Sequence, residues 1–251
     1  MSDPLLRDRV LVGSALAVLA AGSALGPAAP LAVAAAIAIA SVMIALAALL
    51  LGAPATKPTA LLCASLLVLF PTGLLWQPLM AVALGLLAIA AWRRPNLRVK
   101  IGRGNVPWLA TLATAAVTPL ALAIWVAWLH PDLRDVAQRY VPSLPLGLLV
   151  FGGLLFVVSN AALEELIWRG VFQDGLERVW GSGMAIAIQS ISFGILHAHG
   201  VPRGISGVIL AGVWAAMLGM LRHRAGGLLA PFLAHTVADG AIAVIVFAMY
   251  R

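Results

Sequence analysis

Two glutamates, Glu164 and Glu165, stand side by side in an apolar stretch, and the chain has only one further glutamate. A charged side chain at the centre of a membrane helix costs about 2.5 to 3.5 kcal/mol on insertion scales, so it normally faces the protein interior and serves a function. Arg169 follows Glu165 by four positions, which places the acid and the base on one helical face. We therefore predict an ion pair between Glu165 and Arg169. Glu164 has no opposite charge at that spacing and is expected to act as a general base.

Two later segments also carry polar side chains at helical spacing. Phe193 and His197 are four residues apart, and so are His235 and Asp239. Side chains at this spacing share one face of a helix. The sequence therefore predicts that each pair faces a common side, where it can join the glutamates.

The depth of these residues in the membrane can be compared along the chain. A glycine-rich turn at 181–183 separates the segment of Glu164 from that of His197. At a rise of about 1.5 Å per residue, both side chains lie roughly 24 Å from this turn, provided that the first helix continues to Trp180. We therefore expect Glu164 and His197 to meet at a similar height.

The composition defines the class of protein. Hydrophobic residues make up 63% of the chain and charged residues 10%, which excludes a soluble domain. The net charge of +7 is carried by short segments between apolar stretches, so it indicates membrane topology, and we expect a lipid bilayer and no nucleic acid as a partner. The single cysteine, Cys63, excludes a disulfide framework and a cysteine-based metal site.

Apolar stretches of roughly 16 to 23 residues recur along the chain and are long enough to cross a bilayer as helices. The sequence predicts an all-α, polytopic membrane helix bundle with nine spans, or eight if the short runs around Pro71 and Pro78 form one broken hairpin. Arg7 and Arg9 precede the first stretch without a convincing cleavage site, so we expect a span rather than a signal peptide. The nine spans are expected near residues 9–25, 30–51, 59–75, 78–92, 107–129, 146–170, 184–199, 205–221 and 227–249.

The basic residues predict the orientation of the spans. With a cytoplasmic N-terminus, nine spans place most of them inside and the C-terminus outside. The residues expected inside are Arg7, Arg9, Lys57, Arg93, Arg94, Arg98, Lys100, Arg103, Arg178, Arg222 and Arg224. Those expected outside are Arg134, Arg139, Arg203 and Arg251. The basic segment 93–105 separates N-terminal helices without a recognised motif, residues 1–105, from a C-terminal bundle, residues 106–251, whose helices are expected to enclose the active site.

Three motifs of the C-terminal part resemble those of the CAAX prenyl protease and bacteriocin-processing family of intramembrane proteases, which includes the Ras-converting CAAX endopeptidase. The motif Glu-Glu-x-x-x-Arg is found at 164–169, Phe-x-x-x-His at 193–197 and His-x-x-x-Asn/Asp at 235–239. They occur in this order, all within predicted spans. The resemblance covers roughly residues 145–250, which we expect to be the protease core.

The resemblance implies a glutamate-dependent endopeptidase. Glu164, aided by His197, would activate a water molecule for attack on a peptide carbonyl. His235 and Asp239 would stabilise the oxyanion or hold the water. Because an ionised aspartate cannot donate a hydrogen bond, whereas an asparagine can, Asp239 is expected to be protonated or to orient His235 instead.

The same resemblance implies supporting roles for four further side chains. Glu165 and Arg169 would orient the site, and Phe193 and Trp168 would contact the substrate.

The substrate would be a membrane-associated protein or peptide, such as a prenylated C-terminus, a bacteriocin leader or a sorting tail. The residue usage is typical of a prokaryotic chain, so we expect a multi-pass protein of a prokaryotic cytoplasmic membrane. The oligomeric state does not follow from the sequence.

The family has also been described as metalloproteases, because two histidines and a glutamate can bind zinc. In this chain the zinc ligands would be Glu164, His197 and His235. The sequence has no compact helical metal motif such as His-Glu-x-x-His, so we favour a mechanism without a metal or other cofactor.

Two functions of other classes compete with a protease. A transporter or proton channel would also place acids, histidines and arginine within the membrane. It should carry polar residues in both halves, whereas residues 10–92 have almost none. A non-catalytic scaffold or immunity protein with the same fold is the other alternative, and only an activity distinguishes it from an enzyme.

Overall fold

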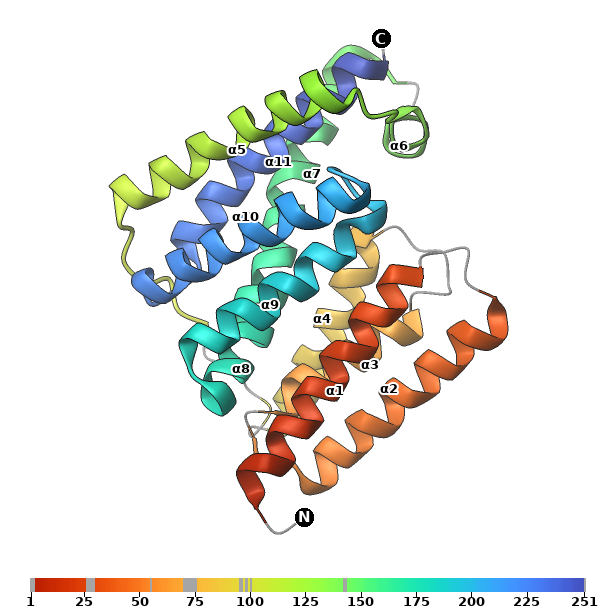
Figure 1. The fold of residues 1–251 in the computed structure, drawn as a ribbon, viewed down its shortest axis with the longest axis vertical. Helices are drawn as coiled ribbons and strands as arrows, with labels where there is room; N and C mark the ends of the chain where they lie inside the picture. Colours follow the sequence, from red (N-terminus) through yellow and green to blue (C-terminus); the bar gives the residue numbers. More distant parts are fainter. Residues whose placement is uncertain are drawn as a thin grey trace. The chain divides into compact units, whose positions relative to one another are not determined.

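The structure is a computed structural model that describes residues 3–25, 30–54, 56–69, 76–94, 97, 99, 101–141 and 144–250. Predictions that involve Pro71, Arg98, Lys100 and Arg251 fall outside these residues. The regular elements of the described part are all helical (Figure 1). They are α1 (Pro4–Leu25), α2 (Leu31–Leu51), α3 (Lys57–Leu69), α4 (Trp76–Arg93), α5 (Trp108–Leu129), α6 (Arg134–Tyr140), α7 (Leu146–Glu165), the π-helix η3 (Leu166–Phe172), α8 (Gln173–Trp180), α9 (Ser182–Leu196), the 3-10 turn η4 (His197–His199), α10 (Gly204–Ala225) and α11 (Leu229–Tyr250).

Seven helices of the described chain are long and apolar enough to cross a membrane, which confirms the polytopic helical bundle. One of them is a helical stretch of 35 residues, Leu146–Trp180, that combines α7, η3 and α8. The condition under which the depths of Glu164 and His197 were compared, that the helix of Glu164 continues to Trp180, is therefore met. The predicted spans near 59–75 and 184–199 contain shorter helices, with 13 residues in α3 and 15 in α9.

The long helical stretch changes its geometry at the paired glutamates. The π-helix η3 begins directly after Glu165 and contains Trp168 and Arg169. Short π-helical segments are rare and occur frequently at functional sites. The sequence pattern predicted a regular helix here, so η3 is a feature that only the structure reveals.

The chain divides into two compact units, each built from two separate stretches of sequence. Unit 1 comprises residues 1–101 and 166–219, and unit 2 comprises residues 102–165 and 220–251. The sequence-based division after residue 105 followed motif content and stays a prediction.

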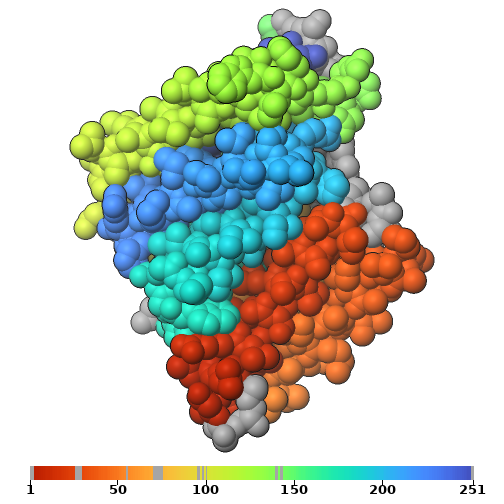
Figure 2. All heavy atoms as spheres, in the orientation of Figure 1, coloured from red at the N-terminus to blue at the C-terminus, as the bar shows by residue number. Residues whose placement is uncertain are grey.

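In unit 1, α1 packs against α2, α3, α8 and α9. Figure 2 shows the atoms of α1, in red, lying directly against those of α9, in teal. Small residues allow the helices of this unit to approach closely. A Cβ at Gly13 of α1 would lie 3.3 Å from the Trp180 ring, and a Cβ at Gly194 of α9 would lie 3.1 Å from Cα of Gly212 in α10.

In unit 2, α11 packs against α5, α6 and α7. The segment before α5 is bonded to the start of α11, because Leu228 N–H donates to the Gly102 carbonyl at 2.9 Å and Leu229 N–H donates to the Arg103 carbonyl at 3.2 Å. Asn105 N–H donates in turn to the Ala225 carbonyl at 2.8 Å. These contacts hold α11 in place, and its packing on α7 brings together the polar residues described next.

Candidate active site

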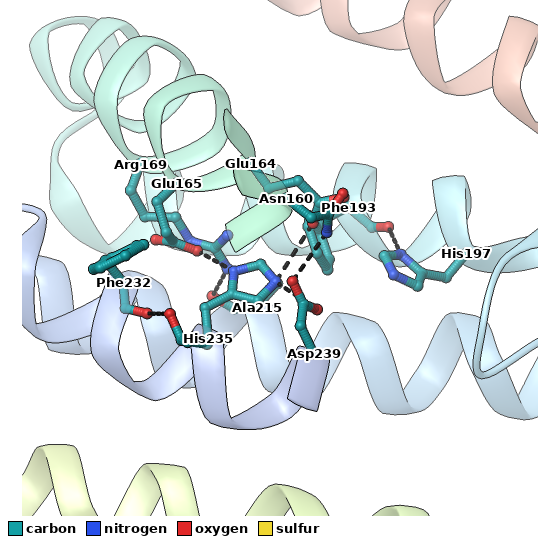
Figure 3. Close-up of polar contacts among 11 residues, drawn as sticks. Asn160, Glu164, Glu165, Arg169, Phe193, His197, Ala215, Phe232, His235 and Asp239 are labelled. Atoms are coloured by element: carbon teal, nitrogen blue, oxygen red, sulfur yellow. Dashed lines mark hydrogen bonds and ion pairs between the residues drawn. The ribbon is translucent and has the colours of Figure 1, made fainter. Parts of the chain in front are cut away.

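Five polar side chains meet between α7 and α11 of unit 2, and we refer to them as the carboxylate-imidazole cluster (Figure 3). Asn160, Glu164 and Glu165 come from the last turns of α7, and His235 and Asp239 come from α11. None of these residues is more than 9% exposed. Three carboxyl groups and one imidazole are thus buried together, an arrangement that is costly unless the groups are paired.

His235 is the centre of this cluster. Its Nδ1 lies 2.6 Å from Oε1 of Glu165, and its Nε2 lies 3.5 Å from both Oε2 of Glu164 and Oδ1 of Asp239. If Glu165 is ionised, it can only accept, so Nδ1 carries the proton of this bond. A singly protonated ring therefore has its lone pair on Nε2, and a ring with both protons donates through Nε2.

Glu164 has no opposite charge three or four positions away on its own helix, as the sequence shows. A partner on another helix could not be read from that spacing. The partner is His235 of another helix, whose Nε2 faces the carboxylate across the contact between α7 and α11. Glu165 is bonded to the same ring, so the two adjacent glutamates act on both nitrogens of one imidazole.

Asn160 is a member of the cluster that the motifs did not include. Its amide Nδ2 donates a hydrogen bond of 3.0 Å to Oδ2 of Asp239. Asn160 precedes Glu164 by four residues and therefore lies on the same face of α7. That spacing was the signal in the sequence by which it could have been found.

Unit 1 holds the other predicted site residues around the Phe193 ring. Arg169 is completely buried, its guanidinium carbon lies 5.1 Å from the centre of the Phe193 ring, and its Nη2 donates to the Ala215 carbonyl at 3.3 Å. The His197 ring lies 4.6 Å from the Phe193 ring, centre to centre. Phe193 thus contacts both the cation and the histidine of the predicted site.

The orientation of His197 is set by its own helix. It follows the last residue of α9 and begins η4, and its Nδ1 bonds the Phe193 carbonyl at 3.0 Å. Because a carbonyl oxygen only accepts, Nδ1 carries the proton and a neutral ring has its basic lone pair on Nε2. The ring is half-buried.

Trp168 and Phe193, the predicted substrate contacts, are buried against each other. Trp168 is 1% exposed and Phe193 is 2% exposed, and the two rings meet edge to face with centres 5.3 Å apart. Phe172 packs on Trp168 in the same manner at 5.0 Å. Such pairs stabilise a fold by about 0.5 to 1.5 kcal/mol beyond area burial. Their contact with a substrate stays a prediction.

Three buried side chains of unit 1 donate hydrogen bonds to the backbone of α10. They are Arg169, Gln173 and Gln189, and we refer to them as the amide-guanidinium cluster. Gln189 Nε2 donates to the Ala215 carbonyl at 3.0 Å, and Gln173 Nε2 donates to the Gly219 carbonyl at 3.0 Å. A Cβ at Gly219 would lie 2.7 Å from Nε2 of Gln189, so glycine provides the space for this approach.

The remaining predictions about the site join residues of different units. These are the approach of His197 to Glu164 and the ion pair of Glu165 with Arg169, and both stay predictions. The zinc ligand set of Glu164, His197 and His235 also stays a prediction. Among the residues that the structure describes, no group of three or more His, Cys, Asp and Glu side chains is arranged to hold a metal ion.

Comparison with known proteins identifies the segment that carries these side chains. Residues 145–241 match the family model "Rce1-like: Type II CAAX prenyl endopeptidase Rce1-like". The matched segment contains all three motifs and both clusters. No curated protein and no solved structure matches the chain.

Proposed function

We propose that this chain, whose residues 145–241 belong to the Rce1-like family of type II CAAX prenyl endopeptidases, is an intramembrane endopeptidase that uses a glutamate-activated water. The observation that supports the mechanism most directly is the carboxylate-imidazole cluster, where Glu164 and Glu165 contact opposite nitrogens of His235. A buried group of this kind is expensive to maintain and is typical of catalytic sites.

In this mechanism Glu164 is the general base. It takes a proton from a water molecule while the water oxygen attacks the carbonyl carbon of the scissile peptide bond. The tetrahedral intermediate carries the negative charge on the former carbonyl oxygen. Return of the proton to the amide nitrogen breaks the carbon-nitrogen bond and releases a carboxylic acid and an amine.

His235 would stabilise the developing negative charge. Glu165 holds its Nδ1, so a ring with both protons directs Nε2–H towards the space in front of Glu164 and Asp239. Such a preorganised donor is effective because it needs no reorganisation during the reaction. An ionised Asp239 cannot donate to the oxyanion, so its role here is to orient His235.

His197 would assist Glu164 at the water. Its Nδ1–H donates to the Phe193 carbonyl, and this bond fixes the ring. Nε2 is then the nitrogen that would transfer a proton. Phe193 packs against this ring from the interior of unit 1, and Arg169 packs against the Phe193 ring. The metal-free form of the mechanism is part of the proposal, and zinc dependence is the alternative that the experiment must distinguish.

We propose a membrane-associated protein or peptide as the substrate, in a prokaryotic cytoplasmic membrane. A prenylated C-terminal peptide of the CAAX type is one candidate, because the matched family model is described by that substrate class. A leader peptide and an unprenylated C-terminal tail are the other two.

The test is peptide cleavage by the purified protein in lipid vesicles, with the three peptide classes and with or without a zinc chelator. Glu164→Gln and His197→Ala should each lower cleavage by roughly 10²- to 10⁴-fold, as expected for loss of a general acid or base. Glu177→Gln makes the same change at the third glutamate, and His199→Ala changes the other histidine of η4. These two control variants should cleave like the wild type.

Each outcome separates the functions under consideration. Cleavage that survives the chelator and requires both side chains supports the proposal. Cleavage that stops with the chelator and returns with zinc identifies the metal-dependent protease instead. Wild-type protein that cleaves none of the three peptides contradicts the proposed activity and favours a scaffold or transporter.

A further inference from the structure

Asn160 has no assigned role in the proposed mechanism, yet it is an integral part of the carboxylate-imidazole cluster. It lies on α7 and is 9% exposed. Its Nδ2 donates to Oδ2 of Asp239 at 3.0 Å, and this is a contact between the only amide and one of the three carboxyl groups of the cluster. An ionised buried carboxylate needs such a donor, because the loss of its water shell is otherwise uncompensated.

The two helices place Asn160 and Asp239 in the same register as the catalytic pair. Asn160 is four residues before Glu164 on α7, and Asp239 is four residues after His235 on α11. The contact between Asn160 and Asp239 therefore lies one helical turn from the contact between Glu164 and His235. The second oxygen of Asp239 lies 3.5 Å from Nε2 of His235.

We propose that Asn160 is a positioning residue that acts on His235 through Asp239. Its amide fixes Oδ2, so Oδ1 stays directed at Nε2 of the imidazole that Glu165 holds from the other side. The chain of contacts from Asn160 to Glu165 thereby fixes the ring plane. This inference rests on the proposed function, because it assigns a purpose to the orientation of His235.

The identity of residue 160 should matter only when residue 239 is an aspartate. Asn160→Asp alone would set two carboxylates where the structure has an amide-carboxylate bond of 3.0 Å. Combining Asn160→Asp with Asp239→Asn restores one amide and one carboxylate, with the donor on the opposite helix. A purely steric role of Asn160 would not show this dependence, because asparagine and aspartate have nearly the same shape.

The experiment is a double-mutant cycle of Asn160→Asp and Asp239→Asn on cleavage in vesicles. Asn160→Asp alone should lower kcat by roughly 10- to 100-fold, as expected for the loss of a hydrogen bond to a charged group. The double variant should cleave at the rate of Asp239→Asn alone. Ser159→Ala, a change at the neighbouring exposed residue of α7, is the control that should keep the wild-type rate. An equal fall in both backgrounds, or no fall in either, overturns the inference.

A second measurement does not depend on cleavage. The imidazole ¹⁵N resonances of histidine-labelled protein report the hydrogen bonds of each ring, and His235→Gln assigns the signals of His235 among the five histidines. Asn160→Asp should shift them, and adding it to Asp239→Asn should not. Unshifted signals in Asn160→Asp contradict the positioning role, whereas a wild type that cleaves no peptide counts against the proposed function alone.

Discussion

The two polar clusters of this membrane protein bury hydrogen-bonding groups in different ways. In the amide-guanidinium cluster of unit 1, Arg169, Gln173 and Gln189 donate to backbone carbonyls of α10. In the carboxylate-imidazole cluster of unit 2, the side chains bond one another, and three acids surround one imidazole. The first arrangement holds neighbouring helices against α10. The second brings together side chains that can exchange protons.

The difference provides a way to separate structural polar residues from the proposed catalytic ones in a bilayer. A bond from a side chain to a backbone carbonyl stabilises packing, since the bilayer core offers no water to replace it. Adjacent carboxylates on one imidazole add little to folding that an apolar contact could not supply. We therefore expect variants of the carboxylate-imidazole cluster to lose activity first and variants of the amide-guanidinium cluster to lose stability first.

Among the three further variants that test this distinction, the largest effect on cleavage is expected from Glu165→Gln in the carboxylate-imidazole cluster. Glutamine keeps the shape and an acceptor for Nδ1 of His235 but removes the charge that strengthens the 2.6 Å bond. Because charge-assisted bonds contribute about 1.5 to 3 kcal/mol, cleavage should fall roughly 10- to 100-fold. The free energy of unfolding, measured by thermal unfolding in detergent, should change by less than about 1 kcal/mol, because the variant also loses the desolvation cost of a buried charge. A large loss of stability with normal cleavage would reverse the distinction between the two clusters.

The largest effect on stability is expected from Arg169→Ala in the amide-guanidinium cluster. The variant loses the bond to the Ala215 carbonyl and the contact with the Phe193 ring, so its free energy of unfolding should fall by about 2 to 4 kcal/mol. Arg178→Ala removes an arginine whose partner is Asp174 on the surface, and it should cost less than about 0.5 kcal/mol. Equal unfolding temperatures for the two variants would show that the buried guanidinium does not stabilise unit 1.

The smallest effect is expected from Phe193→Leu. Leucine keeps an apolar side chain but loses the ring contacts with Trp168 and His197, so stability should fall by about 1 kcal/mol and cleavage by a few-fold. Phe151→Leu is the matched control, because Phe151 is 61% exposed on α7. If both variants behave like the wild type, Phe193 does not position His197.

The amino-acid sequence determined the class of the protein and identified most of the candidate site residues. Long apolar stretches require helices in a bilayer, because a backbone in hydrocarbon must satisfy its own hydrogen bonds. The rarity of acids in such stretches singled out Glu164 and Glu165, and regular helical spacing singled out the pairs that end at His197 and Asp239. Local chemistry of this kind can be read from one segment at a time.

Only the tertiary structure decided which side chains meet. The contact of Glu164 with His235 and that of Asn160 with Asp239 depend on the packing of α7 against α11, and no spacing within either helix specifies it. The π-helix after Glu165 was likewise absent from the sequence pattern, because apolar periodicity does not distinguish it from a regular turn. Pairing across helices is set by the register of two packed surfaces, and that register is a property of the folded chain.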